Sequence, residues 1–135
     1  MDVVILIGRI LFVYLFIGSA LGHLTQTSAM AGYAESRGVP SPKLAAQASG
    51  VVMLVGGLSI LLGVWADLGS LLIAVTMVVT AVMMHAFWKE SDPQAKQGEM
   101  VSFNKDVALA GGALAFYALY YWDAVDWTIT GPLFN

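Results

Sequence analysis

The feature that most constrains this chain is a set of four long apolar stretches within only 135 residues. A transmembrane helix needs about 20 mostly apolar residues, because each residue rises about 1.5 Å through a hydrocarbon layer about 30 Å thick. The four stretches that reach this length cover residues 3–24, 44–66, 68–88 and 103–122. Lipid offers no partners for backbone polar groups, so these segments are predicted to be helices. The sequence thus predicts an all-α protein, with residues 1–135 forming a single membrane domain built as an integral membrane four-helix bundle.

The composition supports lipid as the solvent. Hydrophobic residues make up 59% of the chain and charged residues 11%, whereas soluble domains average about 45–50% and about 25%. A chain this short cannot hide the surplus apolar surface inside a single globule. The absence of cysteine excludes disulfides and thiolate chemistry. A net charge of −3 provides no general basic face for nucleic acid, so the expected partners are membrane lipid and other membrane proteins.

The three links between the stretches differ in character. Residues 65–67 form a very short turn, which predicts an antiparallel hairpin of the second and third helices. Within the first link, residues 28–37 carry apolar side chains at helical spacing and are expected to form a short helix at the membrane interface. Residues 38–42 contain one glycine and two prolines, which stop a helix. Residues 89–102 are polar, with one proline and one glycine, and are interpreted as a solvated loop.

The positive charges of the short loops predict the orientation of the chain, because Lys and Arg favour the cytoplasmic side. The end of the bundle with the two longer links carries five such residues: Arg37, Lys43, Lys89, Lys96 and Lys105. The opposite end, with both termini and the short turn, carries none in its loops. We therefore expect a multi-pass protein of a bacterial inner membrane, with the longer loops cytoplasmic and both termini outside.

Small residues mark where the helices should pack, because helices in lipid associate through close backbone approach. The candidate packing residues are Ser49, Gly56 and Gly63, at intervals of seven, together with Gly111 and Gly112. The same residues could instead form the face of a homo-oligomer, and the sequence does not separate the two arrangements.

Arg9 is the one charge inside the first apolar stretch. Ionisable residues inside membrane spans are costly and are therefore functional candidates. Arg9 lies close to the start of its helix, so its long side chain can reach the interface. We expect it to extend to the interface and pair with Asp67 or Asp123, in preference to a substrate-binding role.

Further polar residues fall near the cytoplasmic ends of the four predicted helices. This candidate polar layer consists of His23, Gln47, His85, Lys105 and Asp106. It could meet a quinone headgroup, a haem propionate or a partner protein, or its members could simply bond to one another and fix the bundle. Two histidines on different helices could also ligate haem b, but His85 lies only four residues from Lys89, at a helix end. The chain shows no metal-binding pattern, and no cofactor of its own is predicted.

The order of several short motifs resembles the DoxX family over nearly the whole chain. These motifs are Arg9, Gly56-Gly57-Leu58, Leu61-Leu62-Gly63, His85-Ala86-Phe87-Trp88, Asp92-Pro93, Phe103-Asn104-Lys105-Asp106 and Ala110-Gly111-Gly112. The resemblance implies a small bacterial or archaeal membrane protein with four helices. The family takes its name from a subunit of an archaeal thiosulfate:quinone oxidoreductase, and other members are proposed to be membrane partners in redox and oxidative-stress complexes.

Two positions depart from the family pattern. Met53 stands where many members have a Glu, and Asp106 stands where Asn is commoner. If that Glu supports proton or quinone chemistry, its absence weakens an enzymatic interpretation. The sequence therefore favours a non-catalytic accessory or anchoring subunit of a redox or respiratory membrane complex. The alternative is a quinone-interacting oxidoreductase subunit that uses the polar layer.

Overall fold

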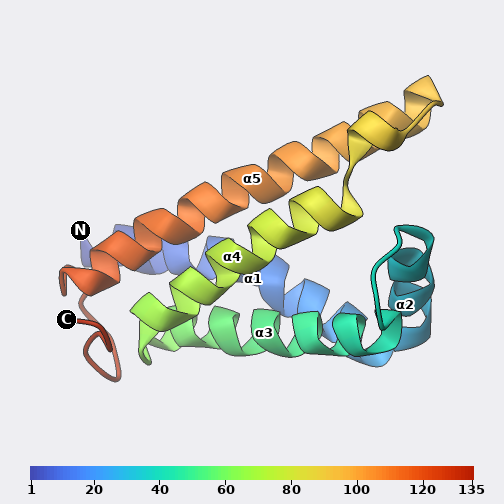
Figure 1. The fold of residues 1–135 in the computed structure, drawn as a ribbon. Coiled ribbons are helices and arrows are strands. Elements are labelled where there is room, and N and C mark those ends of the chain that lie inside the picture. The colour runs from blue at the N-terminus through green and yellow to red at the C-terminus, as the bar shows by residue number, and fades with distance from the viewer.

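The computed structural model describes residues 1–135 and contains only helices (Figure 1). The elements are α1 (Asp2–Thr25), α2 (Thr27–Ser36), α3 (Pro42–Leu62), α4 (Ala66–Met84), the 3-10 turn η1 (Phe87–Lys89) and α5 (Pro93–Tyr121). The all-α prediction is confirmed. The chain has five α-helices. Four of them are long, and the fifth, α2, lies between the first two long helices, close to the short helix expected there.

Three helical segments are long and apolar enough to cross a membrane, namely Asp2–Thr25, Pro42–Leu62 and Ala66–Lys89. Only 26 of the 135 residues are buried, and large apolar side chains point outward, such as Leu11 at 70% and Leu44 at 66% exposure. An outer surface of this kind suits lipid. The fourth predicted span, 103–122, lies within α5 except for its last residue, and α5 is long enough to cross a membrane but is not among the helices that are apolar enough. That span stays a prediction.

The prediction of a solvated loop over residues 89–102 was wrong for most of that segment, because α5 begins at Pro93. The Asp92 side chain accepts a hydrogen bond from the backbone N–H of Ala95 at 2.8 Å and caps the helix. A proline in the first helical turn has no N–H to lose there and a φ already suited to the helix. Gly98 weakens a helix interior by only about 1 kcal/mol. The result is a helix of 29 residues that projects beyond the end of α4.

The long helices pack in the order α1, α3, α4, α5, and the fully buried side chains between them include Phe16, Ile60 and Ile73. Aromatic rings link α1 to α5, since the ring centroids of Phe12 and Phe116 lie 5.2 Å apart. Figure 1 shows α1 and α5 close together at the end with both termini and spread apart toward α2. We call these ends the terminal end and the α2 end. The divergence at the α2 end makes room for the cavity described below.

Gly56 and Gly112 lie at contacts between helices. A Cβ atom at Gly56 would come within 2.9 Å of the side chain of Ile73 on α4, and one at Gly112 within 3.1 Å of the Phe12 ring on α1. At these two points, α3 lies close to α4 and α5 lies close to α1, and a larger residue in place of either glycine would push the helices apart.

The other packing candidates have different surroundings. Gly63 does not lie in a helix seam as expected, because it ends α3 with φ 66° and packs against Thr128 of the C-terminal segment. Only glycine adopts such a left-handed conformation freely. Gly111 faces outward with nothing near it. The Ser49 hydroxyl donates to the Ala46 carbonyl of its own helix at 3.0 Å.

Candidate functional site

A cavity of about 420 Å³ lies at the α2 end, with lining residues from all five helices. Its wall is mostly apolar and includes Phe16, Met53 and Met77. Polar side chains line the rest, among them Ser19, His23, Tyr33, His85, Lys105 and Asp106. A mainly apolar cavity of this size with a few polar groups is typical of ligand-binding sites.

Asp106 is the least satisfied polar group of the cavity wall. Its side chain is 4% exposed, and its Oδ2 atom is buried without a hydrogen-bond partner. Two basic side chains lie close to this carboxylate, with Nζ of Lys105 3.6 Å from Oδ1 and Nε2 of His85 3.6 Å from Oδ2. A buried carboxylate oxygen without a full hydrogen bond is costly. Asp106 therefore offers a strong acceptor to any hydrogen-bond donor that enters the cavity.

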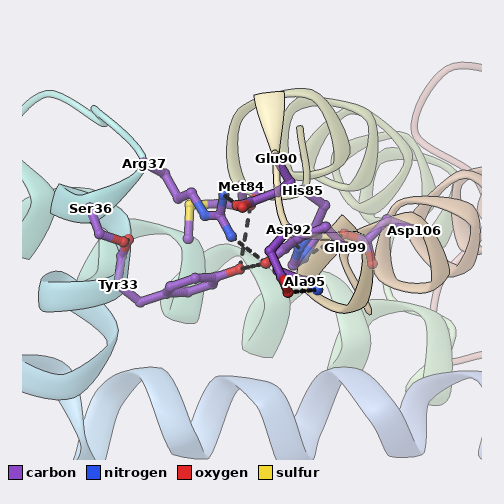
Figure 2. Close-up of polar contacts among 10 residues, drawn as sticks. All are labelled: Tyr33, Ser36, Arg37, Met84, His85, Glu90, Asp92, Ala95, Glu99 and Asp106. Carbon is purple, nitrogen blue, oxygen red and sulfur yellow. Dashed lines mark hydrogen bonds and ion pairs between the residues drawn. The ribbon is translucent and has the colours of Figure 1, made fainter. Parts of the chain in front are cut away.

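His85 lies between two carboxylates. It follows the last residue of α4, where the helix gives way to η1. Its Nδ1 atom is 2.8 Å from Oε2 of Glu99, and its Nε2 atom faces Asp106. Figure 2 shows the imidazole ring between these two side chains of α5. Glu99 and Asp106 are seven residues apart, about two helical turns, and so lie on the same face of α5.

Glu99 is also bound from α2 and from the residue after it. Its Oε1 atom accepts a hydrogen bond from the Tyr33 hydroxyl at 2.9 Å and pairs with Nη2 of Arg37. Arg37 reaches a second carboxylate, with Nη1 2.6 Å from Oε1 of Glu90. We call Tyr33, Arg37, His85, Glu90 and Glu99 the Glu99 network (Figure 2). It joins α2, the link after α4 and α5 at one point.

The surroundings of Glu99 favour its charged form. Burial acts to raise the pKa of Glu99, but the hydrogen bonds to His85 and Tyr33 and the charge of Arg37 outweigh it, so that this pKa lies below its ordinary value. Burial, together with the hydrogen bond to Glu99, raises the pKa of Tyr33. At neutral pH the Tyr33 hydroxyl is therefore a donor and Glu99 an acceptor.

The structure brings together only part of the predicted polar layer. His85, Lys105 and Asp106 share one wall of the cavity. His23 lines the cavity from α1, but its Nδ1 atom lies 2.7 Å from the Ser19 carbonyl of its own helix. Gln47 is exposed and does not line the cavity.

Sequence reasoning missed Tyr33, Arg37, Glu90 and Glu99. The signal for Glu99 was its spacing of seven residues from Asp106, which becomes meaningful only if residues 93–102 are helical. Asp92-Pro93 is a recognisable helix start, so the extended helix was within reach of the sequence. The partners from α2 were not, because they lie more than 50 residues away along the chain.

Arg9 does not pair with Asp67 or Asp123, so the expected interfacial ion pair was wrong. Arg9 is 1% exposed, and its guanidinium donates to backbone carbonyls. Nε reaches the Ile60 carbonyl at 3.1 Å, Nη2 reaches that of Leu61, and Nη1 reaches that of Trp127 at 3.2 Å. The last carbonyls of a helix lack partners within it, and the five N–H groups of a guanidinium can satisfy several at once.

The side chain of Asp67 also holds the C-terminal segment, by accepting hydrogen bonds from the backbone of that segment. Its carboxylate accepts hydrogen bonds from the backbone N–H groups of Leu133 and Phe134, at 2.8 and 2.7 Å. Arg9 and Asp67 thus both lie at the terminal end, away from the cavity, and both serve the fold.

The residues at the cavity do not fit a haem with two histidine ligands. Both ring nitrogens of His85 face carboxylates, and Nδ1 of His23 faces a carbonyl oxygen. No group of three or more His, Asp or Glu side chains is placed to hold a metal ion. The donor set fits a ligand with hydroxyl or carbonyl groups better, because Asp106 can accept and Lys105 can donate.

The comparisons with known proteins support the DoxX resemblance over the first part of the chain, and its motifs from Asp92 onward lie outside the match. The family model described as DoxX matches residues 4–86, more than half of the chain. No curated protein and no solved structure matches. The matched range includes Arg9, Gly56 and His85 and ends before Glu99 and Asp106.

Proposed function

This chain belongs to the DoxX family, and from that premise we propose that it is a membrane subunit of a redox complex that binds a quinol in the cavity at the α2 end. The three apolar helices support the membrane part of this proposal. One observation supports the ligand. The Asp106 carboxylate has a buried oxygen without a hydrogen-bond partner and lines a cavity whose wall is mostly apolar.

A quinol headgroup matches the cavity in both shape and chemistry. Its ring is apolar and suits the wall formed by Phe16, Met53 and Met77, and its hydroxyl groups stand at the ring edge. One hydroxyl can donate to Oδ2 of Asp106. In the oxidised ligand, the carbonyl oxygen that replaces this hydroxyl can accept from Lys105. The quinol supplies the electrons. The residues of this chain bind the ligand, orient it and surround it with apolar side chains.

The subunit role extends the proposal to a partner. The outer face of α5 at Gly111 is open, and Val107 and Leu114 on this helix are about half exposed. A small residue between apolar ones lets a further helix approach closely. We assign this face to a larger redox or respiratory subunit, with a second copy of this chain as the alternative occupant.

The proposed location is the bacterial inner membrane, with the α2 end on the cytoplasmic side. The support is the count of positive charges, five in the longer links and none in the loops of the terminal end. In this orientation the Glu99 network faces the cytoplasm.

Binding of a short-chain quinol to the purified protein in lipid nanodiscs tests the ligand. A hydrogen bond to a charged group is worth about 1.5–3 kcal/mol, so Asp106→Asn should weaken binding about 10- to 100-fold. Asp126→Asn, which alters an exposed carboxylate at the terminal end, should bind as the unaltered protein does. Equal binding by the two variants, or no binding by the unaltered protein, would contradict the proposal.

Purification from native membranes in a mild detergent tests the subunit role separately. A larger redox protein should co-purify with the chain in a fixed ratio. Isolation of the chain alone, together with quinone turnover by the isolated chain, would contradict the subunit role.

A further inference from the structure

We propose that His85 carries protons between Asp106 in the cavity and Glu99 at the edge of the α2 end. The geometry is that of a relay. The Nε2 atom of His85 is 3.6 Å from the Asp106 carboxylate, and Nδ1 is 2.8 Å from Glu99. An imidazole can take a proton at one nitrogen and release one from the other.

Exposure is lowest at the inner end of this route. The side chains of Glu99 and His85 are each 15% exposed, and that of Asp106 is 4% exposed. Chains of Asp, Glu and His that run from water into a membrane protein are typical of proton pathways.

Each step of the relay conserves protons and transfers no electrons. Asp106 receives a proton from a donor in the cavity and passes it to Nε2 of His85, which becomes an imidazolium. The imidazolium then releases its Nδ1 proton to Glu99, and Glu99 gives that proton to water. The pKa of Glu99, lowered by its hydrogen bonds and by Arg37 despite its burial, favours this last release. Water then restores the first tautomer, because Nε2 loses its proton to water while Nδ1 takes one up from water, and uptake through the relay follows the reverse order.

The step between His85 and Asp106 spans slightly more than a hydrogen bond. A small swing of the His85 ring brings Nε2 from 3.6 Å to within hydrogen-bond distance of the Asp106 carboxylate. The titratable and charged groups around this step come from α5, α2 and α1. They are Glu99, Lys105 and Asp106 on α5, Tyr33 on α2 and Arg37 just after it, and His23, which lines the same cavity from α1.

The relay rests on the proposed function for its purpose, because oxidation of a quinol beside Asp106 releases protons that must leave the cavity. Its existence can be tested without any quinone. In lipid nanodiscs, a rapid drop in pH should produce an infrared band of the protonated Asp106 carboxyl, identified by its loss in Asp106→Asn. The rate at which this band appears measures proton delivery.

Replacement of the relay residues should slow that rate. A positioned proton-transfer group typically contributes about 10²–10⁴-fold, so His85→Phe should slow the band about a hundredfold, with its final size unchanged. Glu99→Gln keeps a hydrogen-bonding side chain and should also slow it. Glu35→Gln is the control, since Glu35 is an exposed carboxylate on α2 outside both the relay and the cavity wall. This control should keep the original rate.

Three results would overturn the relay. One is an unchanged rate in both His85→Phe and Glu99→Gln. Another is equal slowing by Glu35→Gln, which would indicate a general effect of losing a carboxylate at the α2 end. The last is the absence of any band that depends on Asp106 at every pH where the protein stays folded. Loss of quinol binding with the relay rates intact would contradict only the proposed function, and intact binding with unchanged rates would contradict only the relay.

Discussion

The buried guanidinium of Arg9 on α1 donates from Nε to the carbonyl of Ile60, 3.1 Å away in the last turn of α3. The same side chain reaches Trp127 in the C-terminal segment. One residue near the start of the chain therefore holds a helix end and the C-terminal segment together.

Replacement of Arg9 should destabilise the terminal end. Arg9→Met keeps most of the apolar stem but removes the donors to the carbonyls of Leu61 and Trp127, whereas the carbonyl of Ile60 keeps a hydrogen bond from the Tyr120 hydroxyl at 2.6 Å. A buried group left unsatisfied costs about 1–3 kcal/mol, so the thermal midpoint in detergent should fall clearly. Arg9→Lys should recover only part of the loss, because an ammonium cannot bond as many separated carbonyls as a guanidinium. Equal thermal midpoints for Arg9→Met, Arg9→Lys and the unaltered protein would show that these hydrogen bonds contribute nothing to stability.

Asp67→Asn should free the end of the C-terminal segment. The Oδ2 atom accepts from two successive backbone N–H groups, those of Leu133 and Phe134, and Oδ1 also accepts from Leu133. An asparagine side chain is uncharged and has an NH2 donor in place of one oxygen, so it binds these N–H groups more weakly. Hydrogen exchange of the C-terminal peptide should become faster while exchange in α3 stays the same. Asp123→Asn alters an exposed carboxylate and serves as the control. Unchanged exchange in Asp67→Asn would contradict the assigned role.

The local signals in the sequence predicted much of the fold. The run Gly38-Val39-Pro40-Ser41-Pro42 ends one helix and starts the next, and the structure has α2 end at Ser36 and α3 begin at Pro42. The start of α5 was missed because the polar composition of residues 93–102 outweighed the capping signal of Asp92-Pro93. A helix that projects beyond its neighbour can be polar on every side, so hydropathy alone does not find it.

The site was predictable only where its residues belong to apolar stretches. His85, Lys105 and Asp106 stood out because polar residues are rare inside such stretches. Arg37 and Glu99 looked like ordinary loop charges, and only the packing of α2 near the α4–α5 link joins them. Arg9 was placed at the wrong partners because its acceptors are backbone carbonyls, which carry no sequence signal.

The Glu99 network should lose stability in acid. A carboxylate whose pKa is lower in the folded state than in the unfolded state stabilises the fold above its ordinary pKa, and this contribution disappears as the pH falls through the lowered value. The unaltered protein should therefore exceed Glu99→Gln in thermal midpoint at neutral pH, and the difference should shrink under acidic conditions. Glu35→Gln should follow the unaltered protein throughout. A difference that is independent of pH would show that the charge of Glu99 is not the source of its contribution.

Replacement by alanine should have opposite effects on stability at Gly56, which lies at a contact between helices, and at Gly111, which lies on the open outer face of α5. Gly56→Ala forces a Cβ to within 2.9 Å of Ile73, and overpacking of this kind typically costs about 1–3 kcal/mol. Gly111→Ala meets nothing within 4 Å and should stabilise the isolated chain by up to about 1 kcal/mol through helix propensity. Thermal midpoints of the two variants test this order. Strong destabilisation of the isolated chain by Gly111→Ala would contradict the open face.

The cap at Asp92 should control the position of Glu99. Loss of an N-cap costs about 0.5–2 kcal/mol, and the first turns of α5 extend beyond α4 with only exposed residues from Pro93 to Gly98. Asp92→Ala should therefore increase hydrogen exchange at Ala95 and the residues after it, whereas Asp92→Asn should keep the cap and the exchange. If the cap also holds Glu99 in register with His85, Asp92→Ala should remove part of the acid-sensitive stability assigned to Glu99. Faster exchange with an unaltered pH dependence would show instead that the hydrogen bonds to Tyr33, Arg37 and His85 hold Glu99 without help from the helix start.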